Sequence, residues 1–226
     1  MTAESVHLPT HRRTRTPFPL LGAAVFLLAY LAVSPVTDRI AALPMPDAPT
    51  AEVYAYFTDH GAASIVTGLL QLVSVAGFAL FLCSALQHEV PSPHRFAARI
   101  IGWVAAVAMV VSSAIAIALP LFAEALSPAA VELGREISFF AGGVVHVLAL
   151  GGLTLTIGLW AAWSRPVRVM AWIAAVPALA SAASLVWYYT SILLPAGRLL
   201  TMLALVVAGI SLVRGRSLGD GDDSLR

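Results

Sequence analysis

The feature that most constrains this chain is a continuous apolar run from Ser138 to Trp163, SFFAGGVVHVLALGGLTLTIGLWAAW. The run exceeds the roughly 20 residues that a helix needs to cross a bilayer. Five more apolar segments of this kind occur, and only 11% of all residues are charged, against about 25% in soluble domains. Because a backbone within lipid must satisfy its own hydrogen bonds, the sequence predicts an all-α integral membrane protein whose partner is the lipid bilayer.

The apolar segments predict a polytopic bundle with six transmembrane helices within residues 17–213. We expect these helices at about 17–36, 62–86, 96–122, 135–163, 167–190 and 196–213. The polar residues 1–16 are expected to form a disordered cytoplasmic tail, and residues 214–226 a second cytoplasmic tail. A signal peptide is the competing interpretation of the first segment. Its apolar core is longer than the roughly 7 to 15 residues usual for a signal peptide, so we expect a retained helix.

The distribution of arginines predicts the orientation of the bundle. All 13 basic residues are arginines, and three of them, Arg39, Arg135 and Arg198, fall on one side of the expected helices. The other side carries Arg12, Arg13, Arg15, Arg95, Arg99, Arg165, Arg168, Arg214, Arg216 and Arg226. Since positive residues favour the cytoplasmic side, both termini are expected in the cytoplasm. The alanine-rich, lysine-free composition suggests a bacterial protein, in the inner (plasma) membrane.

The long connection between the first two helices is acidic and rich in proline. Within it, Thr50 precedes the sequence AEVYAYF. A threonine at this place can cap a helix, and helical spacing puts Val53, Tyr56 and Phe57 on one face. We therefore expect a short amphipathic helix in the headgroup region.

Polar residues within the apolar segments follow helical spacing and mark a candidate binding site. They form three stripes, which are His60, Ser64, Thr67, Gln71 and Ser74; Arg135, Ser138, Gly142 and His146; and Pro177, Ser181, Ser184 and Tyr188. At a rise of about 1.5 Å per residue, Gln71, His146 and Ser181 each lie about 14 to 16 Å below the expected end of their helix. The stripes predict a shared pocket, open to the outer face, with Gln71, His146, Ser181 and Ser184 as ligand-binding residues.

Two other interpretations of these polar residues stay open. Serines and threonines are ordinary packing residues in membrane bundles, and a neutral His146 bonded to a serine or to Gln71 would pin two helices together. An ionisable residue within a membrane nevertheless favours a functional role. Arg135 and Arg198 lie near helix ends, where a long side chain reaches water, so they are expected to be interface anchors.

No motif for a cofactor, a metal or catalysis is found. The histidines around Pro91 and Pro93 lack the helical spacing of a zinc protease, because prolines interrupt them. Cys83 is the only cysteine, so an intrachain disulfide and a cysteine-based zinc site are excluded. We therefore expect no cofactor, no metal site and no catalytic residue, and the net charge of +1 gives no indication of a nucleic-acid partner.

The segment Ala141 to Leu185 contains the mid-depth His146 and the sequence LALGGLTLTIGLWAAWSRPVRVMAWIAAVPAL. An acidic outer loop precedes this segment, and a short turn with two arginines lies inside it. In this pattern the chain resembles an uncharacterised bacterial six-helix integral-membrane family, a domain of unknown function. The resemblance implies the six-helix fold and no particular site.

Two classes of function fit these features. In the first, the protein is a non-enzymatic binding, transport-accessory or sensor protein whose polar pocket receives a small or lipid-like ligand. In the second, it is a membrane-embedded enzyme with His146 as acid or base. An enzyme needs a second titratable group within hydrogen-bond reach, and no Asp or Glu is expected at that depth, so we favour the first class. Six helices are few for a carrier, which leaves room for a homodimer.

Overall fold

The computed structural model describes residues 17–44, 48–86, 92–186 and 192–215. The regular elements of this part of the chain are all helices, joined by turns and loops, and it contains no strand. Five of its helices are long and apolar enough to cross a membrane. The prediction of an all-α protein built from apolar helices is therefore confirmed.

The helices follow one another along the chain with short connections. The described elements are α1 (Phe18–Leu31), α2 (Val33–Thr37), α3 (Thr50–Asp59), α4 (Gly61–Leu86), α5 (Pro93–Phe122), η1 (Ala123–Ala125), α6 (Pro128–Phe139), η2 (Phe140–Val145), α7 (His146–Leu159), α8 (Arg165–Ala180), η3 (Ser181–Leu185) and α9 (Leu193–Val213). The segment η2 is a π-helix that joins α6 to α7 without a break. The three together form one rod, which contains most of the apolar run from Ser138 to Trp163.

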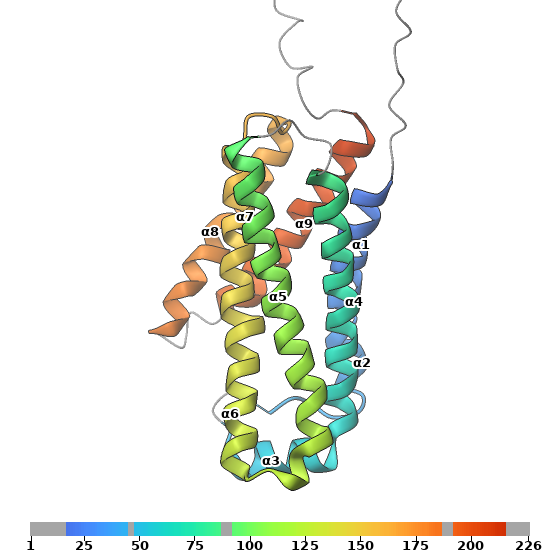
Figure 1. Cartoon of the computed structure of the whole chain (residues 1–226), viewed down its shortest axis with the longest axis vertical. Helices are drawn as coiled ribbons and strands as arrows, with labels where there is room; N and C mark the ends of the chain where they lie inside the picture. The colour runs from blue at the N-terminus through green and yellow to red at the C-terminus, as the bar shows by residue number, and fades with distance from the viewer. Residues whose placement is uncertain (1–16, 45–47, 87–91, 187–191, 216–226) are drawn as a thin grey trace, which may run out of the picture.

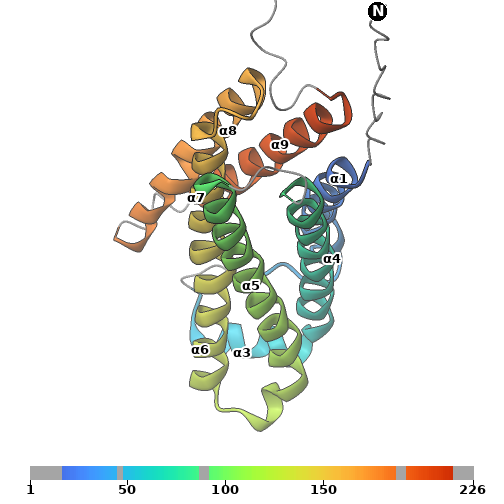
Figure 2. The same cartoon turned by 45° about the horizontal axis from the view of Figure 1, so that its top comes forward.

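The long helices form a ring in which α1 packs against α4, α4 against α5, and α5 against the α6–α7 rod. Helix α9 closes this ring because it contacts both α7 and α1, while α8 packs outside on α7 and α9. Figure 1 shows α4, α5 and the α6–α7 rod running the full height of the bundle, with α8 and α9 beside the upper part only. The short helix α3 crosses the lower end (Figures 1 and 2).

The first predicted helix, about 17–36, is divided into α1 and α2 by a break at Ala32. Pro35 accounts for this break, since a proline ring clashes with the carbonyl four residues earlier, here that of Leu31. Helix α1 alone is about 21 Å long at 1.5 Å per residue, short of the roughly 30 Å hydrocarbon layer. The described helices thus include five candidate spans and this shorter apolar helix.

Other helix bounds differ from those predicted by a turn or two. The fourth apolar segment begins at Pro128 because the Ser127 side chain caps it, accepting a hydrogen bond from the Ala130 N–H. The fifth, predicted to reach residue 190, is α-helical only to Ala180 and continues as the 3-10 segment η3. Residues 187–191 lie outside the described residues, as do the predicted tail 1–16 and most of the tail 214–226.

The predicted short amphipathic helix is confirmed as α3, with Val53, Tyr56 and Phe57 buried on one face. These residues pack against Leu119 and Val131, so α3 closes the lower end of the bundle. The prediction that Thr50 caps this helix is wrong. The Thr50 hydroxyl instead donates a hydrogen bond to the Glu132 carboxylate at 2.6 Å, which ties α3 to α6.

Large apolar side chains cover the outside of the bundle as well as its inside. Buried Phe26, Phe78 and Leu150 form part of the core, yet Phe96 is 68% exposed and Val176 65% exposed. Soluble monomers rarely expose extended apolar surface of this kind. The distribution is that of a protein whose outer surface contacts lipid.

Helices α1 and α4 cross at a pair of facing glycines. A Cβ atom added to Gly77 would lie 2.7 Å from the Phe26 backbone nitrogen and 2.8 Å from the Gly22 carbonyl oxygen. Since backbone atoms cannot move aside as a flexible side chain can, only glycine allows this approach. The contact also places Ser74 where its hydroxyl donates to the Phe26 carbonyl at 2.7 Å.

We predict that Gly77→Val destabilises the bundle by about 1–3 kcal/mol, the usual cost of overpacking a core, because it forces α1 away from α4. The matched control is Ala76→Val on the exposed face of the same helix, which should change stability little. Thermal unfolding of the detergent-solubilised protein, followed by tryptophan fluorescence, measures both. Equal melting temperatures for the two variants would contradict this account of the crossing.

Candidate functional site

A cavity of about 600 Å³ lies in the half of the bundle closed by α3. Side chains from five of the long elements and from α3 line it, together with the connection before α3. The lining residues are Tyr30, Leu43, Pro44, Tyr56, Phe57, Ser64, Thr67, Gln71, Ser112, Ala116, Leu119, Arg135, Glu136, Ser138, Phe139, Gly142, Gly143, Leu194, Pro195 and Arg198. Leu43, Glu136 and Phe139 are exposed, so the wall of the cavity reaches the molecular surface there. Its volume falls in the range of small-molecule sites, about 300–1,000 Å³.

The α4 side of the cavity is polar, as the stripe of residues predicts. Ser64 and Thr67 line it, and their hydroxyls donate to helix carbonyls, at Ala116 on α5 (2.7 Å) and at Ala63 (2.9 Å). Gln71 also lines the cavity, and its side-chain oxygen accepts a long hydrogen bond of 3.4 Å from Ser113. Gln71 is thus the one predicted ligand-binding residue that the structure places in this cavity.

Tyr56 forms part of the wall at the α3 end. Its side chain is only 5% exposed. Burial, and secondarily the negative charge of Asp38, raise the pKa of Tyr56 above the ordinary tyrosine value. The phenol therefore stays protonated and offers the cavity an uncharged hydroxyl.

The stripe Arg135, Ser138, Gly142 and His146 is interrupted by the π-helical segment η2. Arg135, Ser138 and Gly142 line the cavity, and His146 does not. A π-helical turn holds one residue more than an α-helical turn, so the face that continues the stripe shifts after Gly142. Residue spacing that assumes a regular α-helix consequently misplaces His146.

His146 is completely buried between helices rather than beside Gln71. Its Nδ1 lies 2.8 Å from the Ala105 carbonyl oxygen on α5. A carbonyl oxygen only accepts hydrogen bonds, so Nδ1 carries the proton. In a neutral ring Nε2 is then an acceptor, and it has no hydrogen-bond partner in the described residues. The Phe26 ring packs edge-on at 6.3 Å between centroids. Through these contacts His146 holds α7 against α5.

The two predicted serines of the fifth segment also lie outside the cavity. Ser181 is fully buried at the start of η3 and donates to the Ala178 carbonyl at the end of α8, at 2.7 Å. Ser184 belongs to η3, and its buried hydroxyl has no partner among the described residues. Matching depth along three helices therefore does not bring Ser181 and Ser184 together with Gln71, because α8 packs outside the ring.

Arg198 departs most from its predicted role as an interface anchor. Its side chain is only 9% exposed, and it belongs to the cavity wall. The guanidinium lies 5.2 Å from the centroid of the Tyr30 ring on α1, and its Nη2 donates to the Gly142 carbonyl. The prediction is wrong because α9 begins partway along the bundle and not at its end (Figure 1).

The π-helical segment changes which backbone carbonyl accepts the hydrogen bond of the His146 N–H. The His146 N–H donates to the Ala141 carbonyl, five residues earlier, and not to Gly142, four residues earlier. Gly142 is also required sterically, since an added Cβ atom would lie 2.3 Å from the Ser112 hydroxyl oxygen. Arg198, Gly142 and Tyr30 thus join three helices at the cavity. The sequence predicts Arg198 as an interface anchor and does not predict Tyr30 or Arg198 as site residues, although an arginine in the second turn of an apolar helix gains nothing from the helix dipole.

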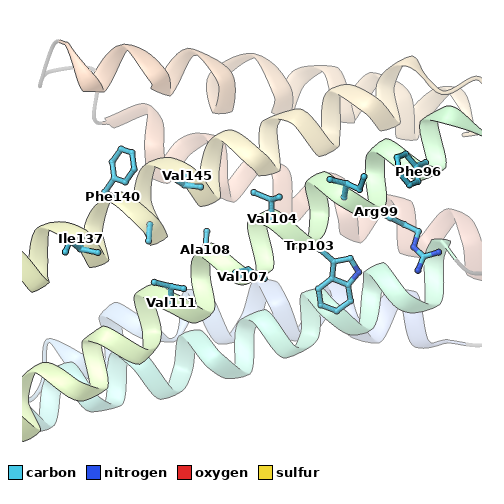
Figure 3. Close-up of a pocket in the computed structure, with 12 residues that line it drawn as sticks. Phe96, Arg99, Trp103, Val104, Val107, Ala108, Val111, Ile137, Phe140 and Val145 are labelled. Carbon is cyan, nitrogen blue, oxygen red and sulfur yellow. The ribbon is translucent and has the colours of Figure 1, made fainter.

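A larger concavity of about 880 Å³ lies on the outer face between α5 and the α6–η2 part of the rod. Figure 3 shows that its labelled side chains are apolar apart from Arg99, at one end. Valines and aromatic residues in this position match the lipid-facing surface on either side of it. We interpret it as part of that surface.

Within the described part of the chain, no three His, Cys, Asp or Glu residues are grouped so that they could hold a metal ion. Searches against protein-family models, curated proteins and solved structures find no match to this chain. The resemblance to the six-helix membrane family therefore stays a prediction, and the function has to be argued from the cavity.

We predict that His146→Ala lowers stability by about 2 kcal/mol, through the space it leaves in the core and the lost hydrogen bond to Ala105. His146→Asn should retain part of that stability, because an asparagine amide can place a donor near the position of Nδ1. Thermal unfolding of both variants measures the difference. An Asn variant no more stable than the Ala variant would show that packing alone, without the hydrogen bond, accounts for the role of His146.

Proposed function

We propose that this protein is a non-enzymatic binding protein of the membrane, whose cavity receives a small or lipid-like ligand as part of a transport-accessory or sensor function. The observation that carries this proposal is the cavity itself, about 600 Å³ with a polar wall inside an apolar bundle. Polar groups within a membrane are expensive and tend to mark functional sites. A ligand in the cavity would supply partners for them.

The mixed composition of the wall supports a ligand with both polar and apolar parts. Gln71, Tyr56 and Arg198 offer polar groups, while Phe57 and Leu119 offer apolar surface. Binding sites for small molecules commonly combine an apolar lining with a few placed polar groups.

The second class, an enzyme with His146 as acid or base, receives less support. Acid–base chemistry needs the reacting group to reach the catalytic nitrogen, and His146 is fully buried and absent from the cavity wall. Its neighbours are the Ala105 carbonyl and the Phe26 ring. We therefore favour binding over catalysis.

We further propose that the chain crosses a bacterial plasma membrane six times, with α1 and α2 together as the first span and both termini in the cytoplasm. The ends of α4, α7 and α9 and the starts of α5 and α8 meet at the end of the bundle opposite α3 (Figure 1). Arg95, Arg99, Arg165, Arg168 and Arg214 lie at this end, in agreement with the positive-inside rule. The cavity, near α3, would then open to the outer side.

This orientation predicts opposite labelling of two single-cysteine variants in a Cys83→Ala background. Ala125→Cys, between α5 and α6, should react with a membrane-impermeant maleimide on intact cells. Ala161→Cys, between α7 and α8, should react only after permeabilisation. Both positions are exposed on the protein surface, so the side of the membrane on which each lies decides whether it reacts. The reverse pattern would overturn the orientation.

The cavity itself is tested with a neutral probe, a fatty alcohol that carries a photoactivatable diazirine. We expect it to cross-link to peptides that contain the cavity residues Ser64–Gln71 and Arg135–Gly143. Thr67→Phe, which fills the cavity, should remove most of this labelling, whereas Val73→Phe on the exposed face of the same helix should not. Mass spectrometry of the digested protein gives the sites. Labelling confined to the outer groove of Figure 3, or labelling unaffected by Thr67→Phe, would contradict the proposal.

A further inference from the structure

The cavity wall holds a buried positive charge, that of Arg198. Arg198 is only 9% exposed, and no carboxylate of the described residues forms an ion pair with it. One of its nitrogens donates to the Gly142 carbonyl, and the Tyr30 side chain accepts another hydrogen bond, while its Nε has no partner in the described part of the chain. A guanidinium has five N–H donors, so the contacts with described residues leave further donors for a ligand.

Burial of such a charge is costly unless something compensates it. A buried charge is normally paired or fully hydrogen-bonded, because its removal from water costs several kcal/mol. A carbonyl and the Tyr30 side chain supply only partial negative charge. Among the described residues no full negative charge therefore compensates Arg198, and an anionic ligand would supply one.

The arrangement around Arg198 favours an anion over other ligands. Among the described residues that line the cavity, Glu136 supplies the one carboxylate. Glu136 is exposed and belongs to the part of the wall that reaches the surface. In the described part of the chain, the buried wall thus carries the positive charge of Arg198 and no carboxylate.

We propose that the ligand is an amphiphile whose oxyanion, a carboxylate or a phosphate, binds the Arg198 guanidinium, with its chain along the apolar wall of Phe57, Leu119 and Leu194. A guanidinium matches two oxygens of such a group through parallel hydrogen bonds. Hydroxyls of Tyr56 and Thr67 line the same cavity. This inference rests on the proposed ligand-binding function and adds to it the charge of the ligand.

A purely structural role for Arg198 makes a different prediction. If its contacts to Gly142 and Tyr30 only hold α9 in place, its replacement lowers stability but the cavity has no preference between charged and neutral ligands. The decisive measurement is therefore a comparison of ligands that differ only in the charge of the head, not the stability of a variant.

The test uses the full-length protein in nanodiscs and two diazirine probes with the same chain, a fatty acid and the corresponding fatty alcohol. The pH is kept alkaline so that the fatty acid is ionised, because the bilayer raises the pKa of its carboxyl group above the value in water. We expect the fatty acid to label the cavity peptides at a concentration about tenfold lower than the alcohol, the factor that corresponds to one charge-assisted hydrogen bond. An alkylamine probe of the same chain should label them least.

Variants assign this preference to one residue. Arg198→Gln should make the acid and the alcohol equal, and Arg198→Lys should keep part of the preference because it keeps the charge. Arg99→Gln, at the outer groove, removes an exposed arginine and should change nothing. If Arg198→Gln does not fold, competition on the wild-type protein replaces it, and unlabelled dodecanoate should displace the probe about tenfold better than dodecanol.

The outcomes separate this inference from the proposed function. Equal labelling of the cavity by acid and alcohol in the wild-type protein, or a preference that survives in Arg198→Gln, would overturn the anionic ligand and leave the binding function intact. Failure of both probes to label the cavity would overturn the binding function itself. Displacement by inorganic phosphate or acetate as effective as that by dodecanoate would support the oxyanion site and overturn the apolar chain.

Discussion

Hydrocarbon offers no hydrogen bonds, so a protein within it must satisfy its polar groups internally. Most buried polar side chains of this bundle do so against a helix backbone. Ser74 donates to the Phe26 carbonyl, Ser64 to the Ala116 carbonyl, and His146 contacts the Ala105 carbonyl. Each of these bonds joins two different helices. They are packing contacts, whereas Arg198 is a buried charged side chain whose Nε has no partner among the described residues.

The π-helical segment η2 links the fold to the proposed site. It interrupts the regular hydrogen bonding of the rod, since the His146 N–H bonds Ala141 in place of Gly142, and the Gly142 carbonyl then accepts from Arg198. The same segment shifts the register, so Gly142 faces the cavity while His146 faces α5. A local irregularity of the backbone thus separates a residue of the cavity wall from a packing residue on one continuous rod. π-Bulges are often found at functional sites for this reason.

The spacing of apolar and polar residues predicted the structure well where an element is a regular α-helix that packs against the helix next to it in the chain. The apolar runs gave α4, α5 and α9 within a few residues, and helical spacing placed Val53, Tyr56 and Phe57 on the buried face of α3. It placed Gln71, Ser64 and Thr67 correctly on one wall of the cavity. It failed at Leu31, where Pro35 ends the helix, and at His146, where a π turn replaces an α turn. The prediction also failed for Arg198, because the length and the charge of an arginine side chain, taken alone, place its guanidinium at the surface.

The amino-acid sequence by itself determined the medium and the secondary structure of this protein, because the length and apolarity of a segment decide whether it can cross a bilayer as a helix. It also determined which end of the bundle carries most of the arginines. Only the tertiary structure decided which polar residues meet. Which polar residues meet depends on the level at which α9 joins the ring of helices and on the extra residue of the π-helical turn near Gly142. Neither follows from the local conformational preferences of the residues. The buried guanidinium at the cavity is a product of helix packing, since residues distant in the chain create its surroundings.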